Sequence, residues 1–260
     1  MEKDKIYNMD CLEGMRSIPD GSIDAIICDL PYGTTACTWD SIIPLEPLWE
    51  QYKRVIKPNG AIVLFSAQPF TTRLISSNMD MFKYCWVWKK DNATNFLSAK
   101  HQPLKVTEDI CIFGKAPITD NVNGIYLAYN PQMRTGFKAY SCVSGAQKEN
   151  GAVVRHGCKA SRGGYETNND GSRYPINILE FQRDKDKLHP TQKPIDLIRY
   201  LIRTYTTEGE TILDNCIGSG TTAIACIKEK RHFIGFELDK DYYNIATQRI
   251  ALELSQPELF

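Results

Sequence analysis

The chain has 260 residues, which fits one α/β domain with room for a sizeable insertion. Lysine plus arginine total 31 and aspartate plus glutamate total 31, so the formal net charge is zero. This balance excludes a uniformly basic nucleic-acid coat and an acidic disordered tail, and a polyanion would have to be held by a local patch. The sequence contains no apolar run near the roughly 18 residues of a membrane span, so we expect a soluble protein that is not bound to a membrane.

The N-terminus and the cysteines indicate the compartment. Residues 1–7 lack the apolar stretch and the cleavage site of a secretory signal. The nine cysteines are odd in number and include no Cys-x-x-Cys pair, which disfavours a disulfide framework and a zinc site. We expect reduced cysteines in the core, no metal and a cytoplasmic location.

The first half of the chain predicts alternating strands and helices. Residues 24–28 form a β-rich run that ends at Asp29-Leu-Pro-Tyr-Gly33, where proline stops the strand. Apolar residues at helical spacing over 45–56 precede Pro58-Asn59-Gly60 and the apolar run 61–65. Similar segments follow at 70–75, 84–88 and 109–113. The alternation predicts an α/β domain with a mostly parallel sheet.

From about residue 115 to residue 187 the composition changes to glycine, asparagine, serine and arginine, without a sustained period. Because so long a segment without structure is improbable inside a compact domain, we expect an inserted lobe. A disordered surface loop is the alternative. The expected organisation is therefore 1–114, an insertion over 115–187, and 188–260.

The last third predicts a βαβ unit. His189-Pro-Thr-Gln-Lys-Pro194 precedes a helix whose apolar face runs from Ile195 to Tyr205. We expect a strand over 210–214, a glycine turn over 216–220, a helix over 221–231, a strand over 232–237 and a helix from about 241.

Two glycines and one acidic residue of this unit indicate a ligand. Gly218-x-Gly220 lies where a strand passes into a helix, a place where a ligand can approach the backbone. Glu237 follows 23 residues after Asp214, a spacing typical of an acidic residue that binds ribose hydroxyls. The pattern predicts a nucleoside-bearing cofactor; an ordinary tight turn and a solvated strand end are the alternatives. A nicotinamide dinucleotide is disfavoured because Ala223 replaces the third glycine of its fingerprint.

The segment Asp29-Leu-Pro-Tyr32 joins a carboxylate, a rigid backbone and an aromatic ring at the end of another strand. A planar amine could donate to the carboxylate and to a backbone carbonyl while its ring stacks on Tyr32. A plain turn is the alternative for this segment taken alone.

Three segments together resemble β-class, circularly permuted amino-methyltransferases of DNA. Asp29-Leu-Pro-Tyr-Gly33 resembles their D-P-P-Y motif, Asp214-Asn-Cys-Ile-Gly-Ser-Gly-Thr-Thr222 their S-adenosylmethionine motif, and His189-Pro-Thr-Gln-Lys-Pro194 their H-P-T-x-K-P segment. The resemblance covers about residues 5–115 and 187–252. It implies a Rossmann-like S-adenosylmethionine-dependent fold with helices on both faces of the sheet and an inserted target-recognition lobe.

The resemblance implies a role for each matching residue. Asp29 and the backbone carbonyl of Leu30 would accept the hydrogen bonds of the target amine, next to Pro31, and Tyr32 would stack on the flipped base. Leu30 replaces the usual proline, which leaves the carbonyl in place but makes the turn less rigid. The cofactor-binding residues would be Asp10, Asp29, Thr191, Lys193, Asp214, Cys216, Gly218, Gly220, Thr221, Thr222 and Glu237.

The implied activity is site-specific methylation of the N6 amine of adenine in double-stranded DNA, since Asp at position 29 resembles the adenine-directed variant. Methylation of cytosine N4, of RNA or of a glutamine amide, and an inactive DNA-binding module, are the alternatives. Contacts to DNA are expected from Arg134, Lys138, Arg155, Arg162 and Arg173 in the middle region, although Glu149, Glu166 and Asp170 offset their charge. The family suggests a bacterial or phage protein, and a homodimer is left open.

Overall fold

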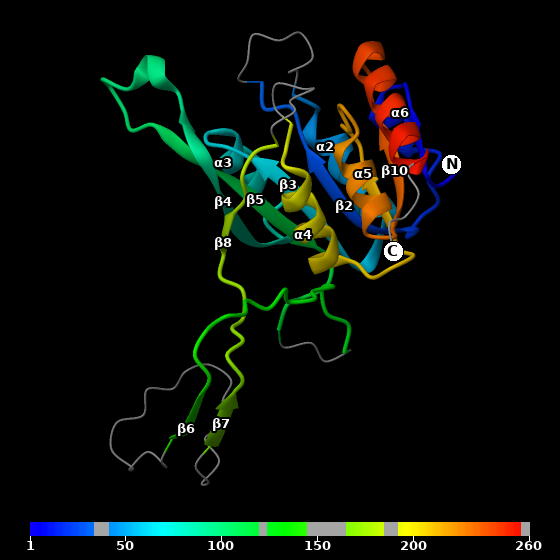
Figure 1. Cartoon of the computed structure of the whole chain (residues 1–260). Coiled ribbons are helices and arrows are strands. Elements are labelled where there is room, and N and C mark those ends of the chain that lie inside the picture. Colours follow the sequence, from blue (N-terminus) through cyan, green and yellow to red (C-terminus); the bar gives the residue numbers. More distant parts are fainter. Residues whose placement is uncertain (34–41, 120–123, 145–164, 185–191, 256–260) are drawn as a thin grey trace. The chain divides into compact units, whose positions relative to one another are not determined.

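The computed structural model describes residues 1–33, 42–119, 124–144, 165–184 and 192–255 (Figure 1). The chain forms two compact units, one made of Met1–Asn130 with Ile176–Phe260 and the other of Pro131–Pro175. The strands of the larger unit are β1 (Lys5–Tyr7), β2 (Ile23–Asp29), β3 (Ile56–Ser66), β4 (Phe82–Thr94), β5 (Lys105–Gly114), β8 (Ile178–Glu180), β9 (Thr211–Asp214) and β10 (His232–Phe236). Its helices are α1 (Cys11–Met15), α2 (Leu45–Val55), α3 (Phe70–Ser77), the short 3₁₀ helix η1 (Phe96–Ser98), α4 (Ile195–Tyr205), α5 (Thr221–Lys228) and α6 (Lys240–Ser255). None of the helices formed by these described residues has the length and apolar character needed to cross a bilayer.

The eight strands form one mixed sheet in the order β1-β10-β9-β2-β3-β5-β4-β8. The five strands from β1 to β3 are parallel, as predicted, and so is the pair of β4 and β8. β5 runs antiparallel to both β3 and β4. The segments expected at 84–88 and 109–113 are therefore the two arms of a long hairpin, because the connection between them is too short for a parallel crossover.

The sheet is buried on both faces, so its central strands read as continuous apolar runs. In β2, Ala25 and Ile27 pack in the cluster that α4, α5 and α6 cover, whereas Ile26 and Cys28 pack in the cluster of α1, α2 and α3. In Figure 1, α4, α5 and α6 lie in front of the sheet and α2 and α3 lie behind it. The alternation of side chains along each strand divides the core between the two layers of helices.

The boundary between α2 and β3 differs from the expectation. β3 begins at Ile56, directly after the helix, and includes Pro58-Asn59-Gly60, which was expected to separate the two elements. The pairing with β2 shifts register between Ile23 and Ala25, opposite this segment. Proline and glycine are tolerated at such an irregularity, where a strand leaves the regular ladder.

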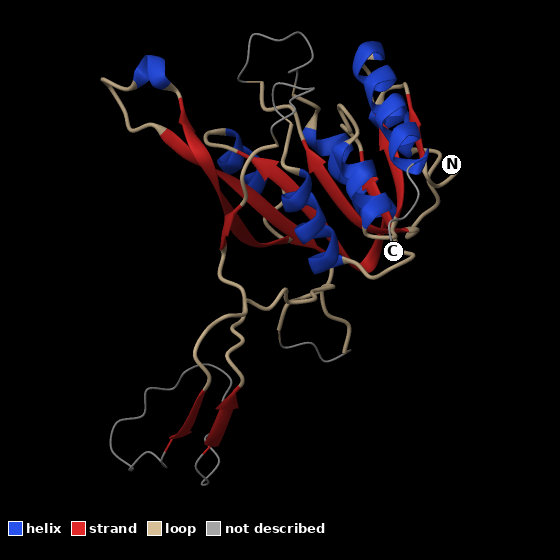
Figure 2. Cartoon of the chain, in the orientation of Figure 1, coloured by secondary structure: helices blue, strands red, loops and turns tan. Residues whose placement is uncertain are grey.

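The smaller unit contains the antiparallel strands β6 (Tyr140–Ser144) and β7 (Tyr165–Asn169), which are coloured red in Figure 2. Beyond them the chain pairs at Arg134 and Arg173. This unit is shorter than the insertion expected over 115–187. Leu127 is buried in the core of the larger unit, and β8 pairs with β4, so both flanks of the expected insertion belong to the larger unit.

Candidate functional site

A cavity of about 720 Å³ opens at the carboxyl ends of β2, β9 and β10. In the sheet, the connection that follows β9 runs to β10 on one side, and the connection that follows β2 runs to β3 on the other side. The strand order therefore reverses between the neighbours β9 and β2. Ligands of open α/β sheets bind at such a reversal. The volume lies within the range of small-molecule and cofactor sites.

The glycine loop between β9 and α5 forms one wall of the cavity. Gly218 and Gly220 have φ values of +54° and +84°, a conformation that favours glycine. A Cβ at Gly220 would lie 3.0 Å from Cβ of Ala246 on α6, whereas a Cβ at Gly218 would meet nothing within 4 Å. Gly220 therefore lets α5 pack against α6, and Gly218 leaves open space at the cavity wall.

Glu237 directly follows β10 and fixes the loop from the opposite side. Its carboxylate accepts hydrogen bonds from the backbone N–H of Gly218 at 2.8 Å and of Asp239 at 2.8 Å. Burial raises the pKa of this carboxyl, and the two backbone bonds oppose the shift. A carboxylate has about four acceptor positions, so the group can still accept hydrogen bonds from a ligand's hydroxyls.

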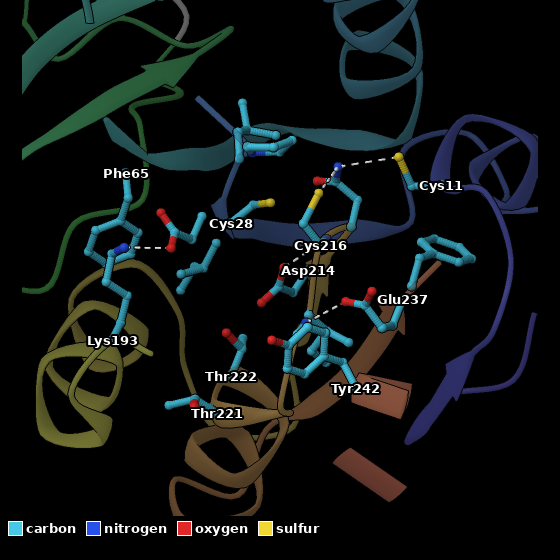
Figure 3. A pocket seen from close by; sticks show the side chains of 18 of the residues that line it. Cys11, Cys28, Phe65, Lys193, Asp214, Cys216, Thr221, Thr222, Glu237 and Tyr242 are labelled. Atoms are coloured by element: carbon cyan, nitrogen blue, oxygen red, sulfur yellow. Dashed lines mark hydrogen bonds and ion pairs between the residues drawn. The ribbon is translucent and has the colours of Figure 1, made fainter. Parts of the chain in front are cut away.

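Asp214 ends β9 at the centre of the cavity floor, between Lys193 and Glu237 in Figure 3. Its side chain accepts a hydrogen bond from the N–H of Cys216 at 3.1 Å and another from the hydroxyl of Thr222. Burial raises the pKa of Asp214 to about 7. A cation bound beside it would favour the ionised carboxylate.

Asp10 also lines the cavity, and it caps α1. One carboxylate oxygen accepts from the backbone N–H groups of Leu12 at 2.8 Å and Glu13 at 3.1 Å. This capping explains why an aspartate stands here, and it orients the side chain at the cavity rim.

Asp29 ends β2 at the other end of the cavity, next to Leu30 and Pro31. The hydroxyl of Tyr32 donates to Oδ1 of Asp29 at 2.8 Å, and Nζ of Lys193 lies 2.5 Å from Oδ2. The ring of Tyr32 stacks on Phe70, with the ring centroids 5.2 Å apart. Burial raises the pKa of Asp29, and the positive charge of Lys193 opposes this shift.

Two residues that the sequence analysis did not single out extend this ion pair. Glu108 on β5 lies 3.4 Å from Nζ of Lys193 and 2.9 Å from Nζ of Lys90 on β4. Burial raises the pKa of Glu108, but the two lysines outweigh burial, so the net shift is downward. Burial lowers the pKa of Lys193, but Asp29 and Glu108 outweigh burial, so the net shift is upward. The four side chains form a chain of alternating charge around the buried Lys193, which is held charged.

Further cavity residues lie outside the three sequence motifs, on strands, a loop and helix α6: Phe65, Trp88, Arg183 and Tyr242. Trp88 and Lys90 are two residues apart on β4, so they face the same side of the strand, and Trp88 lies opposite Glu108 in the ladder. The sequence analysis predicts an apolar segment at 84–88 and assigns no role to the polar residues that follow it. The pairing of β4 with β5 and of β5 with β3 brings these side chains near Asp29.

Other expected residues are placed differently or lie outside the described part of the chain. Thr191, Arg155 and Arg162 are not among the described residues. In the smaller unit, Arg134 and Arg173 stack on the ring of Phe137, at 5.1 Å and 5.5 Å from its centroid. Arg173 also donates to the carbonyl of Lys138 at 2.9 Å, so its guanidinium holds this unit together.

The cysteines at the cavity are Cys11, Cys28 and Cys216 (Figure 3). They are free thiols; Cys11 and Cys28 are buried, and Cys216 is half-buried at the cavity wall. The amide of Asn215 donates to the sulfur atoms of Cys11 and Cys216 at 3.6 Å and 3.5 Å. The described residues contain no group of three or more potential ligands suited to a metal ion.

The chain is similar to known proteins over nearly its whole length. A family model described as "DNA methylase" matches residues 23–248. The type II methyltransferase M.HindIII of Haemophilus influenzae is 25% identical, with 96% of each chain covered. The type II methyltransferase M.BglII of Bacillus subtilis is 28% identical, with 96% of this chain and 69% of the relative covered.

Two solved structures share the fold. A complex of M1.HpyAVI with SAM has a TM-score of 0.60 at 24% identity, and covers 94% of this chain and 98% of that one. The cytosine-N4-specific PvuII DNA methyltransferase has a TM-score of 0.68 at 15% identity, and covers 100% of this chain and 89% of that one. These likenesses confirm the predicted Rossmann-like methyltransferase fold.

Proposed function

The chain belongs to the DNA methylase family, and from this premise we propose that it transfers a methyl group from S-adenosylmethionine to the N6 amine of adenine in double-stranded DNA. One observation carries the proposal. A single cavity is lined at one end by the glycine loop and the carboxylate of Glu237, and at the other end by Asp29 and Tyr32 at the end of β2. The proposed activity is that of a type II modification enzyme, as the names of the relatives indicate for those proteins.

S-adenosylmethionine is the cofactor, and the described residues fit it. Gly218 leaves open space at the wall, Glu237 offers acceptors for ribose hydroxyls, and Asp214 offers a carboxylate for an ammonium group. When bound, the cofactor supplies an electrophilic methyl group. We propose that Glu237 and Asp10 hold the adenosyl end, and that Asp214, Thr221 and Thr222 hold the methionine end.

Asp29 and the carbonyl of Leu30 are the proposed acceptors for the two hydrogens of the target amine. The lone pair of this amine is delocalised into the base, so the free amine is a poor nucleophile. Two acceptors draw the nitrogen toward a tetrahedral form and orient its lone pair, which is catalysis by positioning and electrostatics. Because burial raises its pKa, Asp29 is also the proposed acceptor of the proton that the methylated nitrogen loses.

Adenine is the proposed base because a carboxylate at position 29 resembles the adenine-directed variant of the motif. Cytosine N4 is a similar planar amine, and the fold is shared with a cytosine-N4-specific enzyme. Methylation of cytosine N4 is therefore the alternative. The identity of the methylated nucleoside decides between the two.

A base within a duplex cannot reach a pocket at the end of a strand, so the proposed reaction requires the target to be flipped out. Additional contacts to the duplex are proposed for the region 115–187, including Arg134, Lys138 and Arg173. The proposed compartment is the bacterial cytoplasm, where the DNA lies. An inactive DNA-binding module is disfavoured, because Asp29, Tyr32 and the glycine loop are all present.

The test is transfer of labelled methyl from S-adenosylmethionine to unmethylated duplex DNA, followed by digestion to nucleosides. We expect label in N6-methyl-2′-deoxyadenosine. Asp29→Ala should reduce the rate by about a hundredfold or more, because an acceptor aimed at the reacting amine is lost. The control is Asp20→Ala, which removes an exposed aspartate paired with Arg54 and should leave the rate unchanged.

Each other outcome has a definite meaning. Label in N4-methyl-2′-deoxycytidine would keep the mechanism and overturn the base. Absence of label in a protein that binds S-adenosylmethionine would overturn the proposed methylation of DNA, in favour of an inactive DNA-binding module or of an RNA or protein substrate. An unaltered rate in Asp29→Ala would contradict the assigned role of Asp29.

A further inference from the structure

The hairpin of β4 and β5 ends in a tip with unusually exposed apolar side chains. Leu97 is 102% exposed and Phe96 is 66% exposed, and both lie in the short helix η1. Figure 2 shows this single turn of helix at the end of the two long red strands. Adjacent large side chains exposed to this degree are typical of a surface that contacts a partner.

The tip has a defined backbone that holds these side chains outward. Asn95 adopts the left-handed conformation, with φ of 73°, and starts the turn. The N–H of Ser98 donates to the carbonyl of Asn95 at 3.1 Å, and the N–H of Gln102 donates to the carbonyl of Ser98 at 3.0 Å. The tip therefore presents Phe96 and Leu97 on a folded turn.

The charge of the hairpin fits a polyanion. Residues 92–107 contain Lys100, Lys105 and no aspartate or glutamate, in a chain whose net charge is zero. The acidic residues on either side are paired, Asp91 with Arg183 at 2.9 Å and Glu108 with Lys90 at 2.9 Å. The hairpin end is thus a local positive patch of the kind that a neutral DNA-binding chain requires.

The hairpin also reaches the cavity. Lys90 and Thr94 on β4 line the same cavity as Asp29 and Tyr32. Leu97 is three residues beyond Thr94, a distance of at most about 11 Å along an extended chain. This reach corresponds to about three base steps of a duplex. A duplex whose flipped base enters the cavity would lie within reach of the tip.

We propose that Phe96 and Leu97 form a wedge that enters the duplex beside the target base, with Lys100 and Lys105 against neighbouring phosphates. The inference rests on the proposed function, since it assigns a DNA contact to the same site. Apolar side chains inserted between base steps unstack them, which lowers the cost of extruding the neighbouring base. The wedge positions the substrate and takes no part in the methyl transfer itself.

The test compares the wild type with the double variant Phe96→Ala/Leu97→Ala on two duplexes. One duplex carries the recognition site, identified by sequencing DNA that the wild type has methylated, with the target base paired. The other carries a mismatch opposite the target base, which already favours flipping. Met79→Ala is the matched control, because it also removes an exposed apolar side chain, 61% exposed, between α3 and β4.

We expect the double variant to lose about ten- to a hundredfold in kcat/KM on the paired duplex and less than about threefold on the mismatched one. The affinity of the double variant for S-adenosylmethionine should match that of the wild type. Met79→Ala should have the wild-type kcat/KM on both duplexes. Equal losses on both duplexes, or no loss on either, would overturn the wedge. If the wild type is a dimer in solution and the double variant is a monomer, the tip forms contacts between copies of the chain, and the wedge is overturned.

Failure of the proposed function gives a different result. In that case the wild type transfers no methyl group to DNA, so no recognition site is identified and the paired and mismatched duplexes cannot be designed. Binding of a duplex of random sequence, measured by fluorescence anisotropy, still tests the contact between the tip and DNA that the wedge requires. Weaker binding by the double variant than by Met79→Ala would support the contact, and equal binding would overturn it.

Discussion

Four charged side chains alternate in sign at the end of the cavity that holds Asp29. Their order is Asp29, Lys193, Glu108 and Lys90, joined at 2.5, 3.4 and 2.9 Å. The side chain of Lys193 is 8% exposed and that of Glu108 is 16% exposed, so water screens their interaction weakly. Glu108 therefore influences Asp29 directly by its charge and indirectly by sharing Lys193.

The variant Glu108→Gln should move the acid limb of the kcat profile to lower pH. The negative charge of Glu108 contributes to the raised pKa of Asp29, so its removal favours the ionised Asp29 at lower pH. Of the two carboxylates paired with Lys193, Asp29 would then remain. The full charge of Lys193 on Asp29 also lowers the pKa of Asp29. The measurement is kcat between pH 4.5 and 8 with saturating S-adenosylmethionine and DNA.

The control for this prediction is Glu180→Gln on β8, where the carboxylate is 68% exposed and pairs with Lys89. It should leave the acid limb unchanged. Glu108→Gln also leaves Lys90 without its partner, so we expect a loss of about 1–3 kcal/mol in unfolding free energy, checked by thermal unfolding. An acid limb that stays in place or moves to higher pH in the folded variant would contradict the coupling.

At the scale of single residues, sequence reasoning finds groups that stand in local motifs. Asp214, Gly218 and Glu237 follow from the order of strand, turn and helix, because Asp214 and Glu237 lie at the ends of strands that local periodicity predicts and Gly218 lies in the turn between strand and helix. Glu108 and Lys90 could not be found in this way. Their proximity to Asp29 arises from a hairpin and a sheet register that join residues far apart in the chain.

The glycine loop is the element that links the fold to cofactor binding. Gly218 has a positive φ and open space where a Cβ would be, and Gly209, in the turn before β9, shares both properties. Gly218 lines the cavity, whereas Gly209 does not appear among its lining residues. Alanine substitutions at the two glycines therefore distinguish the effect of backbone strain on stability from the effect of a lost ligand contact on cofactor binding.

We expect Gly218→Ala and Gly209→Ala to lower the unfolding free energy by a similar amount, about 1–2 kcal/mol, because each places alanine in the left-handed region. Only Gly218→Ala should weaken S-adenosylmethionine binding, by about tenfold or more, because its methyl group occupies space at the cavity wall. Chemical denaturation and isothermal titration measure the two effects. Equal cofactor affinities in the two variants would remove the loop from the binding site.

Elements with a strong local pattern were predicted within a few residues, whereas their pairing was not. β2, α4 and β9 were expected at 24–28, from Ile195 to Tyr205 and at 210–214, and the structure has them at Ile23–Asp29, Ile195–Tyr205 and Thr211–Asp214. The hairpin of β4 and β5 was missed because polar residues extend both strands beyond their apolar centres. Those residues are stabilised by pairing across the hairpin, and the local pattern of apolar and polar residues gives no information on this pairing.

At the scale of the whole molecule, zero net charge means that attraction to DNA must come from separate basic patches. Candidates among the described residues are the hairpin with Lys100 and Lys105, and the unit Pro131–Pro175 with its exposed Lys138. Arg173 of this unit is bound by its own neighbours, so its replacement would test the stability of the unit rather than a DNA contact. Lys138 is the better probe of this region.

The salt dependence of duplex binding measures the contribution of Lys138. If Lys138 contacts a phosphate, Lys138→Ala should reduce the slope of log affinity against log salt concentration by about 0.9, the value for one ion pair with B-DNA. Lys53→Ala on α2 removes another exposed lysine and should leave the slope unchanged. The affinities are measured by fluorescence anisotropy between about 50 and 200 mM salt. Identical slopes for Lys138→Ala and the wild type would exclude a phosphate contact at Lys138, because each such contact releases counterions from the DNA and so contributes to the slope.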